Sequence, residues 1–295
     1  MEIKEFGRIM AREVKDALGE EYEVKCNEII KNNGVVRSAL VIRKEDEFVS
    51  PTIYLDSFFE KYNDGVMVMS LVSELVKMYH CSTVPAAGLE MDFFRDFSEV
   101  ACKLCYKLVN YDKNAEALRD IPYKKVMDLA MVPLCRVEND IIGSGNITVT
   151  NTHLKMWEIS EEELWENIKE NAPKIAPVKV QGLPDVIQKL TGCEDNIFPI
   201  SGISVVSNLS ECLGAGAVFY PGVLKSLSEE FESDLYIIPS SIHEVLVIPA
   251  SDMSIDIEGL SSIIREVNTT TVSDEEILSD NLYIYRIEAD MVSIA

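Results

Sequence analysis

The chain has 295 residues, of which 47% are hydrophobic, a composition typical of a globular protein with a sizeable core. Its formal net charge of −23 is uneven, because residues 151–295 carry 8 basic side chains against 25 acidic ones. Such a field argues against direct binding to nucleic-acid phosphates. Apolar runs fall far short of the about 18 residues that a membrane helix needs. Seven scattered cysteines and an N-terminus without the apolar core of a signal peptide predict a reduced, cytoplasmic protein.

The first third of the chain predicts a hairpin accompanied by helices. Apolar residues recur at helical spacing over residues 2–18, whereas apolar and polar residues alternate over 22–26, as in a strand. Asn32-Asn33-Gly34 favours a tight turn before a return strand at 35–43. Further expected elements are an extended segment at 51–55, a helix over 58–62 capped by Asp56 or Ser57, and helices over 68–79 and 93–108.

The remainder predicts pairs of strands separated by helices. Ser160 and Glu163 have the spacing of a capping box, and Pro173 is expected just beyond the end of that helix. Residues 173–195 are rich in proline and glycine and are expected to be irregular. The other expected elements are a turn at 143–146, strands at 123–137, 147–150, 200–206, 216–220, 235–238, 244–248 and 282–287, helices after 221 and over 257–267, and a second capping box at Ser273 and Glu276.

This order of elements predicts an α+β fold. Neighbouring strand pairs without strict βαβ alternation indicate an antiparallel-rich mixed sheet with flanking helices, preceded by an N-terminal hairpin-and-helix region. A soft boundary near 110–120, between a helical first part and a sheet-rich second part, suggests two domains, 1–115 and 116–295. A single continuous fold, with the hairpin packed into it, stays open as an alternative.

The polar segment Ser240-Ser241-Ile242-His243-Glu244 lies at a bend between two apolar strands, where functional side chains often gather. His243 is a candidate general base and Ser240 or Ser241 a candidate nucleophile. Asp128, which interrupts an apolar run, is a candidate distant acid. His243 and Glu244 are adjacent and would point to opposite faces of a strand, and neither GxSxG nor HExxH occurs. Turn-stabilising hydroxyls and a hydrogen-bonded structural Asp128 are therefore the competing interpretations.

Three further motifs have structural explanations. His153, after Asn151-Thr152, is a candidate base or ligand, but capping and packing explain the same pattern. Cys102-Lys103-Leu104-Cys105 lacks a second pair of zinc ligands and lies within a predicted helix, which favours packing. The spacing of Gly214-Ala215-Gly216 fits neither the Walker loop nor GxGxxG. The glycines therefore indicate close backbone packing and not a phosphate site. The sequence thus predicts no cofactor and no metal.

Several segments together carry a family resemblance. They are Pro51-Thr52-Ile53-Tyr54-Leu55, the following 59–65, Thr150-Asn151-Thr152-His153-Leu154, and 239–245. They resemble an uncharacterised bacterial family, unknown-function domain family 5688, over most of the chain. The resemblance implies family membership but supplies no catalytic residue, substrate or cofactor.

Three functional hypotheses follow from these patterns. The first is a cytoplasmic, non-catalytic protein that binds a basic protein partner through its acidic second half, with no membrane and no direct nucleic-acid contact. The second is a hydrolase-like enzyme that uses Ser240, Ser241 and His243. The third is an acidic mimic of nucleic acid that occupies a basic protein.

Overall fold

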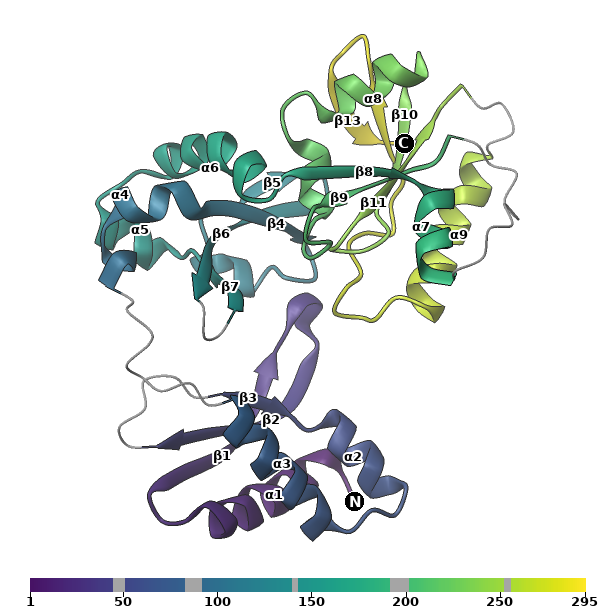
Figure 1. The fold of residues 1–295 in the computed structure, drawn as a ribbon. Helices are drawn as coiled ribbons and strands as arrows, with labels where there is room; N and C mark the ends of the chain where they lie inside the picture. Colours follow the sequence, from purple (N-terminus) through teal and green to yellow (C-terminus); the bar gives the residue numbers. More distant parts are fainter. Residues whose placement is uncertain (45–50, 83–91, 140–142, 192–201, 252–255) are drawn as a thin grey trace. The chain divides into compact units, whose positions relative to one another are not determined.

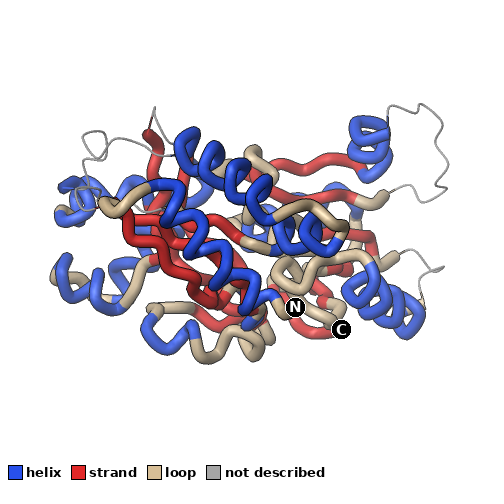
Figure 2. Tube along the Cα trace, turned by 90° about the horizontal axis from the view of Figure 1, so that it is seen from below, coloured by secondary structure: helices blue, strands red, loops and turns tan. Residues whose placement is uncertain are grey.

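A computed structural model describes the chain except for residues 45–50, 83–91, 140–142, 192–201 and 252–255 (Figure 1). Helices and strands are both abundant, as the colouring of Figure 2 shows. Every strand pairing with a defined register among the described residues is antiparallel. The fold is therefore α+β, as the sequence predicted. None of the helices in the described part combines the length and hydropathy needed to cross a bilayer.

The chain forms two compact units. One comprises residues 1–91 with 139–143, and the other comprises residues 92–138 with 144–295. The boundary suggested by the sequence, between 115 and 116, falls inside the second unit. There it separates two strands that pair with the same central strand, because residues 104–110 and 124–126 both bond to residues 129–139.

The first unit packs helices on a three-stranded sheet in the order β1-β2-β3. Phe6, Met10 and Val14 form the buried stripe of the first helix, and the hairpin turn uses positive φ angles at Asn33 and Gly34. The predicted hairpin and helices are confirmed. The elements are α1 (Ile3–Leu18), β1 (Tyr22–Ile30), β2 (Val36–Lys44), β3 (Thr52–Tyr54), α2 (Asp56–Asn63) and α3 (Val68–Ser82).

The expected cap of α2 is wrong. Asp56 is the first helical residue and Leu55 occupies the N-cap position without a side-chain hydrogen bond. The Asp56 carboxylate instead accepts a hydrogen bond from Arg37 Nη1 at 3.0 Å, which joins the helix to β2.

The second unit begins with a four-stranded sheet in the order β4-β6-β5, with β7 paired to β6. The predicted helix over 93–108 is wrong beyond residue 103, because residues 104–110 form a strand that pairs with β6 over its whole length. An apolar run of this length fits both the helical and the strand periodicity, and pairing with β6 selects the strand. The elements are α4 (Phe97–Val100), β4 (Leu104–Asn110), β5 (Lys124–Val126), β6 (Leu129–Asn139) and β7 (Gly143–Thr148).

Two helices, α5 (Asn151–Trp157) and α6 (Glu161–Ile175), follow β7, and α6 packs along β4 (Figure 1). The Ser160 hydroxyl accepts the Glu163 amide at 3.1 Å, so the predicted cap is confirmed. Pro173 was expected beyond the helix but lies inside its last turn. The expected turn at 143–146 is also wrong, since β7 starts at Gly143.

A six-stranded antiparallel sheet, in the order β13-β12-β10-β11-β9-β8, completes the second unit. Leu235, Ile237, Val245 and Val247 belong to a core that also contains Leu227 of the helix α8. The elements are β8 (Val178–Gly182), α7 (Leu183–Thr191), β9 (Ser204–Asn208), α8 (Val223–Phe231), β10 (Leu235–Ile238), β11 (Val245–Pro249), α9 (Ile257–Thr270), β12 (Tyr283–Arg286) and β13 (Met291–Ile294).

Three expectations for this part of the chain are corrected, and one strand was missed. Residues 178–191, expected to be irregular, form β8 and α7, and the expected strand at 216–220 is wrong, because residues 215–219 form a 3-10 turn. Ser273 does not cap a helix, since its carbonyl accepts the amides of residues 276 and 277 in a turn. The sequence also missed β13, a short strand that pairs with β12. The part of the predicted strand at 200–201 lies outside the described residues.

Candidate functional site

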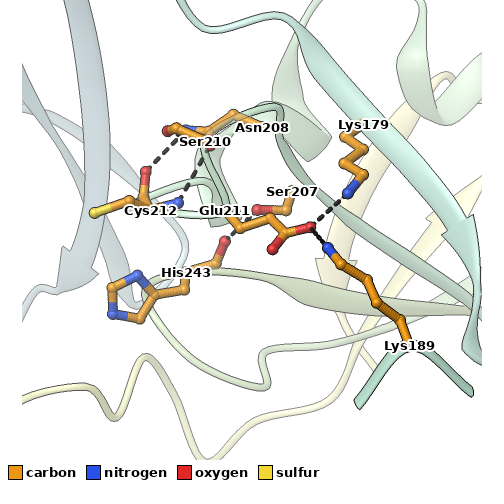
Figure 3. Close-up of polar contacts among 8 residues, drawn as sticks. All are labelled: Lys179, Lys189, Ser207, Asn208, Ser210, Glu211, Cys212 and His243. Carbon is orange, nitrogen blue, oxygen red and sulfur yellow. Dashed lines mark hydrogen bonds and ion pairs between the residues drawn. The ribbon is translucent and has the colours of Figure 1, made fainter. Parts of the chain in front are cut away.

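His243, from the polar segment at 240–244, lies beside a hydrogen-bonded loop that follows β9 (Figure 3). Asn208 is 6% exposed and organises this loop from within. Its Nδ2 donates to the Cys212 carbonyl at 2.8 Å, and its Oδ1 accepts from Ser210 Oγ at 2.9 Å and from the Cys212 amide at 3.3 Å. The loop carries positive φ angles at Glu211 and Leu213, which side-chain-bearing residues rarely adopt. The network of bonds holds this strained backbone in place.

His243 faces the same loop from the segment between β10 and β11. Its Nδ1 accepts the Leu213 amide at 3.1 Å, so the neutral imidazole carries its proton on Nε2, and Nε2 lies 3.6 Å from Glu276 Oε1. The His243 carbonyl accepts the Ser207 hydroxyl at 2.7 Å. The lone pair that a general base would use is therefore already bonded to a backbone amide.

The two candidate nucleophiles are not aligned with that histidine. Ser241 Oγ accepts the His243 amide at 3.0 Å, and the Ser240 amide donates to the Ile238 carbonyl. Within the described part of the chain, no hydrogen bond joins the imidazole to either hydroxyl. This arrangement is that of a hydroxyl-stabilised turn.

Glu211 projects from the loop between two cations (Figure 3). Its carboxylate pairs with Lys179 of β8 and, at 3.1 Å, with Lys189 of α7. Hydrogen bonds from these two lysines lower the pKa of the Glu211 carboxyl. These two ion pairs tie the loop to the edge strand β8 and to α7, the helix that follows it.

Asp128 lies elsewhere and has a different set of partners. Its Oδ2 accepts from Ser279 Oγ at 2.6 Å and from Asn281 Nδ2 at 3.0 Å, and its Oδ1 accepts from the Tyr283 hydroxyl at 2.7 Å. The carboxylate joins the turn between β5 and β6 to the start of β12. The structure thus bonds Asp128 to these donors and not to His243.

His153 lies in the first turn of α5. Its Nδ1 accepts the Thr150 amide at 3.1 Å, and its ring contacts the rings of Phe94 and Trp157. Burial lowers the pKa of His153, with a smaller opposing effect from Asp120. The expected caps, Asn151 or Thr152, are wrong, because Thr150 is the N-cap residue and His153 completes a capping box with it.

The cysteine motif is divided between two environments. Cys102 is exposed in a 3-10 turn, whereas Cys105 is 6% exposed on β4. Burial raises the pKa of the Cys105 thiol to about 11, which disfavours the reactive thiolate. Within the described residues, no three His, Cys, Asp or Glu side chains converge as a metal site.

The glycine motif is confirmed as a place of close packing. A Cβ atom at Gly214 would lie 2.3 Å from Ser207 Oγ, and one at Gly216 would lie 2.8 Å from Cε2 of Tyr106. Both positions therefore exclude any larger residue without movement of their neighbours.

Sequence reasoning missed a second site, a cavity of about 200 Å³ in the same unit. Its wall includes Tyr106, Trp165, Phe219 and Tyr220, which are far apart in the sequence and belong to no motif. They share no local sequence pattern that could have predicted the cavity. Pairing of β4 with β6 and packing of α6 on β4 are needed to bring these rings together.

The fold and these sites define an α+β protein of two units, with a bonded polar loop and an aromatic cavity in the second. The family model described as "Family of unknown function (DUF5688)" matches residues 3–287, and the chain belongs to this family. Neither a curated protein nor a solved structure matches the chain.

Proposed function

We propose that this chain is a non-catalytic protein-interaction protein of the bacterial cytoplasm, whose second unit binds a basic protein. The proposal assigns it no direct contact with nucleic acid or with membranes. It is supported by the distribution of charge, because the carboxyl-terminal half has about three acidic side chains for each basic one.

The observation that carries the proposal is a row of carboxylates on α6. Glu163, Glu166 and Glu170 recur at i, i+3 and i+7, which places them on one helical face, and all three are exposed. The pKa of Glu170 is lowered by a hydrogen bond from Lys174 at 2.8 Å. A row of ionised groups on a rigid helix attracts a partner of opposite charge and orients it.

The test compares two triple variants of equal charge change. One removes the row (Glu163→Gln, Glu166→Gln, Glu170→Gln), and the control removes exposed carboxylates of other helices (Glu230→Gln, Glu258→Gln, Glu266→Gln). Glutamine at position 163 preserves a capping-box residue. Both variants and the parent chain serve as bait, at about 50 mM and about 300 mM salt, and bound proteins are quantified by mass spectrometry.

We expect a basic protein that binds the parent chain and the control at low salt, binds less at high salt, and is lost from the row variant. Equal recovery on the row variant and on the control would overturn the assignment to α6. A set of partners indifferent to salt would remove the electrostatic basis of the proposal.

A further inference from the structure

The aromatic cavity lies on the second unit, where α6 faces β4, β5 and the segment around the 3-10 turn at 215–219. The rings of Tyr106 and Trp165 have centroids 6.2 Å apart, and those of Tyr106 and Tyr220 are 5.8 Å apart and nearly perpendicular. Phe219 and the aliphatic side chain of Ile168 extend the apolar wall. The cavity volume, about 200 Å³, is below the range typical of drug-sized ligands, so it suits a single ring with a short substituent.

One polar group of this wall has no internal partner. Tyr220 is 6% exposed, yet within the described residues its hydroxyl forms no hydrogen bond. Tyr106, its neighbour, donates to the Gly216 carbonyl at 2.8 Å. No fully buried side-chain nitrogen or oxygen in the described part lacks a partner, so the Tyr220 hydroxyl keeps some solvent-accessible surface, and Tyr220 is one of the residues that line the cavity. Buried tyrosine hydroxyls usually find a partner, and a ligand can supply it.

Two ammonium groups complete the cavity. Lys124 lies over the Trp165 ring, with Nζ 5.0 Å from the ring centroid, and Lys169 follows on the next turn of α6. Neither lysine forms an ion pair among the described residues, although the pKa of the nearby Glu162 carboxyl is lowered, chiefly by hydrogen bonds and least by the charge of Lys124. Both lysines are exposed, and both belong to the lining of the cavity.

We propose that this cavity binds a small aromatic carboxylate. The ring of the ligand packs against Tyr106, Trp165 and Phe219, the Tyr220 hydroxyl donates to one carboxylate oxygen, and Lys124 and Lys169 neutralise the anion. Aromatic contacts supply the apolar part of the affinity and charge-assisted hydrogen bonds select the anion. The lining of this cavity includes none of the three glutamates proposed to bind a protein partner.

Ligand-observed NMR with the full chain tests the proposal, with benzoate as the probe. Benzamide is its neutral planar counterpart of the same shape, and benzylamine is a cationic counterpart of similar size. Saturable binding of benzoate is expected, with benzamide weaker by about tenfold and benzylamine weaker still, because a charge-assisted hydrogen bond is worth more than a neutral one.

Variants then assign the site. Lys124→Gln combined with Lys169→Gln is expected to weaken benzoate binding by about tenfold, and Tyr220→Phe by about fivefold. The matched control, Lys155→Gln combined with Lys225→Gln, changes the charge equally at exposed lysines outside the cavity and should leave binding unchanged. Circular dichroism and urea unfolding establish that each variant is folded.

Three results would overturn the proposal. The first is the absence of saturable benzoate binding to the parent chain. The second is equal affinity for benzoate and benzamide, which would remove the role of the lysines. The third is an equal loss of affinity in the cavity variant and in the control, which would assign any binding to net charge and not to this site.

Discussion

Two regions of the second unit contain unusual polar groups, and they differ in whether those groups are already bonded. Around Asn208 and His243, the side-chain amide and the imidazole Nδ1 bond to the backbone of one loop. In the aromatic cavity, the Tyr220 hydroxyl and two lysines have no hydrogen-bond or ion-pair partner among the described residues. A bonded cluster stabilises the fold, whereas an unbonded one in a cavity is suited to bind something else. The polar character of a segment therefore does not by itself identify a site.

Substitution of Gly214 by alanine is the strongest test of the bonded cluster. The new Cβ would lie 2.3 Å from Ser207 Oγ, 2.5 Å from the Asn208 amide nitrogen and 2.9 Å from the His243 oxygen. Two of these atoms are backbone and cannot rotate away. We expect the free energy of unfolding to fall by about 3 kcal/mol, measured by urea denaturation.

The matched control for this substitution is Gly145→Ala. Gly145 is exposed in β7, and a Cβ there meets no atom within 4 Å. Its expected effect is within about 0.5 kcal/mol of zero. If both alanine variants were equally stable, the loop at 209–213 would be far more adaptable than its bonds indicate, and the contrast with the cavity would fail.

Asp128→Asn tests a second bonded cluster. The carboxylate accepts three hydrogen bonds, and an asparagine would turn a donor toward at least one of the donors Ser279, Asn281 or Tyr283. We expect a loss of about 2 kcal/mol in the free energy of unfolding. Asp112→Asn, at an exposed position, is the control and should change stability little. An Asp128→Asn variant as stable as the control would exclude the structural role of the carboxylate.

A pair of tyrosine variants compares bonded and unbonded hydroxyls within the cavity itself. Tyr106→Phe removes a hydrogen bond of 2.8 Å to the Gly216 carbonyl and should cost about 1 kcal/mol. Tyr220→Phe removes a hydroxyl without an internal partner and should leave stability within about 0.5 kcal/mol of the parent. Thermal and urea unfolding of both variants provide the measurement. A larger loss for Tyr220→Phe than for Tyr106→Phe would contradict the assignment of Tyr220 as the free group.

The sequence predicts much of the fold where local chemistry is strong. The Asn33-Gly34 turn, the Ser160 cap and the amphipathic α1 each have an identifiable local cause, and all three are confirmed. Prediction fails where two structures satisfy the same local pattern. Residues 104–108 suit either a helix or a strand, and only the distant partner β6 selects the strand.

The sites divide in the same way. A turn stabilised by hydroxyls at 240–241 was one of the two interpretations that the residue types allowed, and Ser241 Oγ does accept the His243 amide. The cavity was not, because Tyr106, Trp165 and Tyr220 come from three separate segments and each looks like an ordinary core residue. The missing partner of a hydroxyl is a property of packing, which no sequence pattern carries.

The buried, hydrogen-bonded imidazole of His153 should make the free energy of unfolding depend on pH, and this is the smallest of the expected effects. Burial lowers its pKa below the ordinary value of 6.5, so the unfolded chain binds a proton before the folded chain does. Stability is therefore full above that ordinary value and declines as the pH falls from it toward the lowered pKa. His153→Gln retains an acceptor for the Thr150 amide and removes the titration, so it should lose less stability than the parent between about pH 7.5 and about pH 5.5. If urea unfolding gave the same pH dependence for His153→Gln as for the parent, another group would have to account for it, and the bonded imidazole would carry no penalty for its burial.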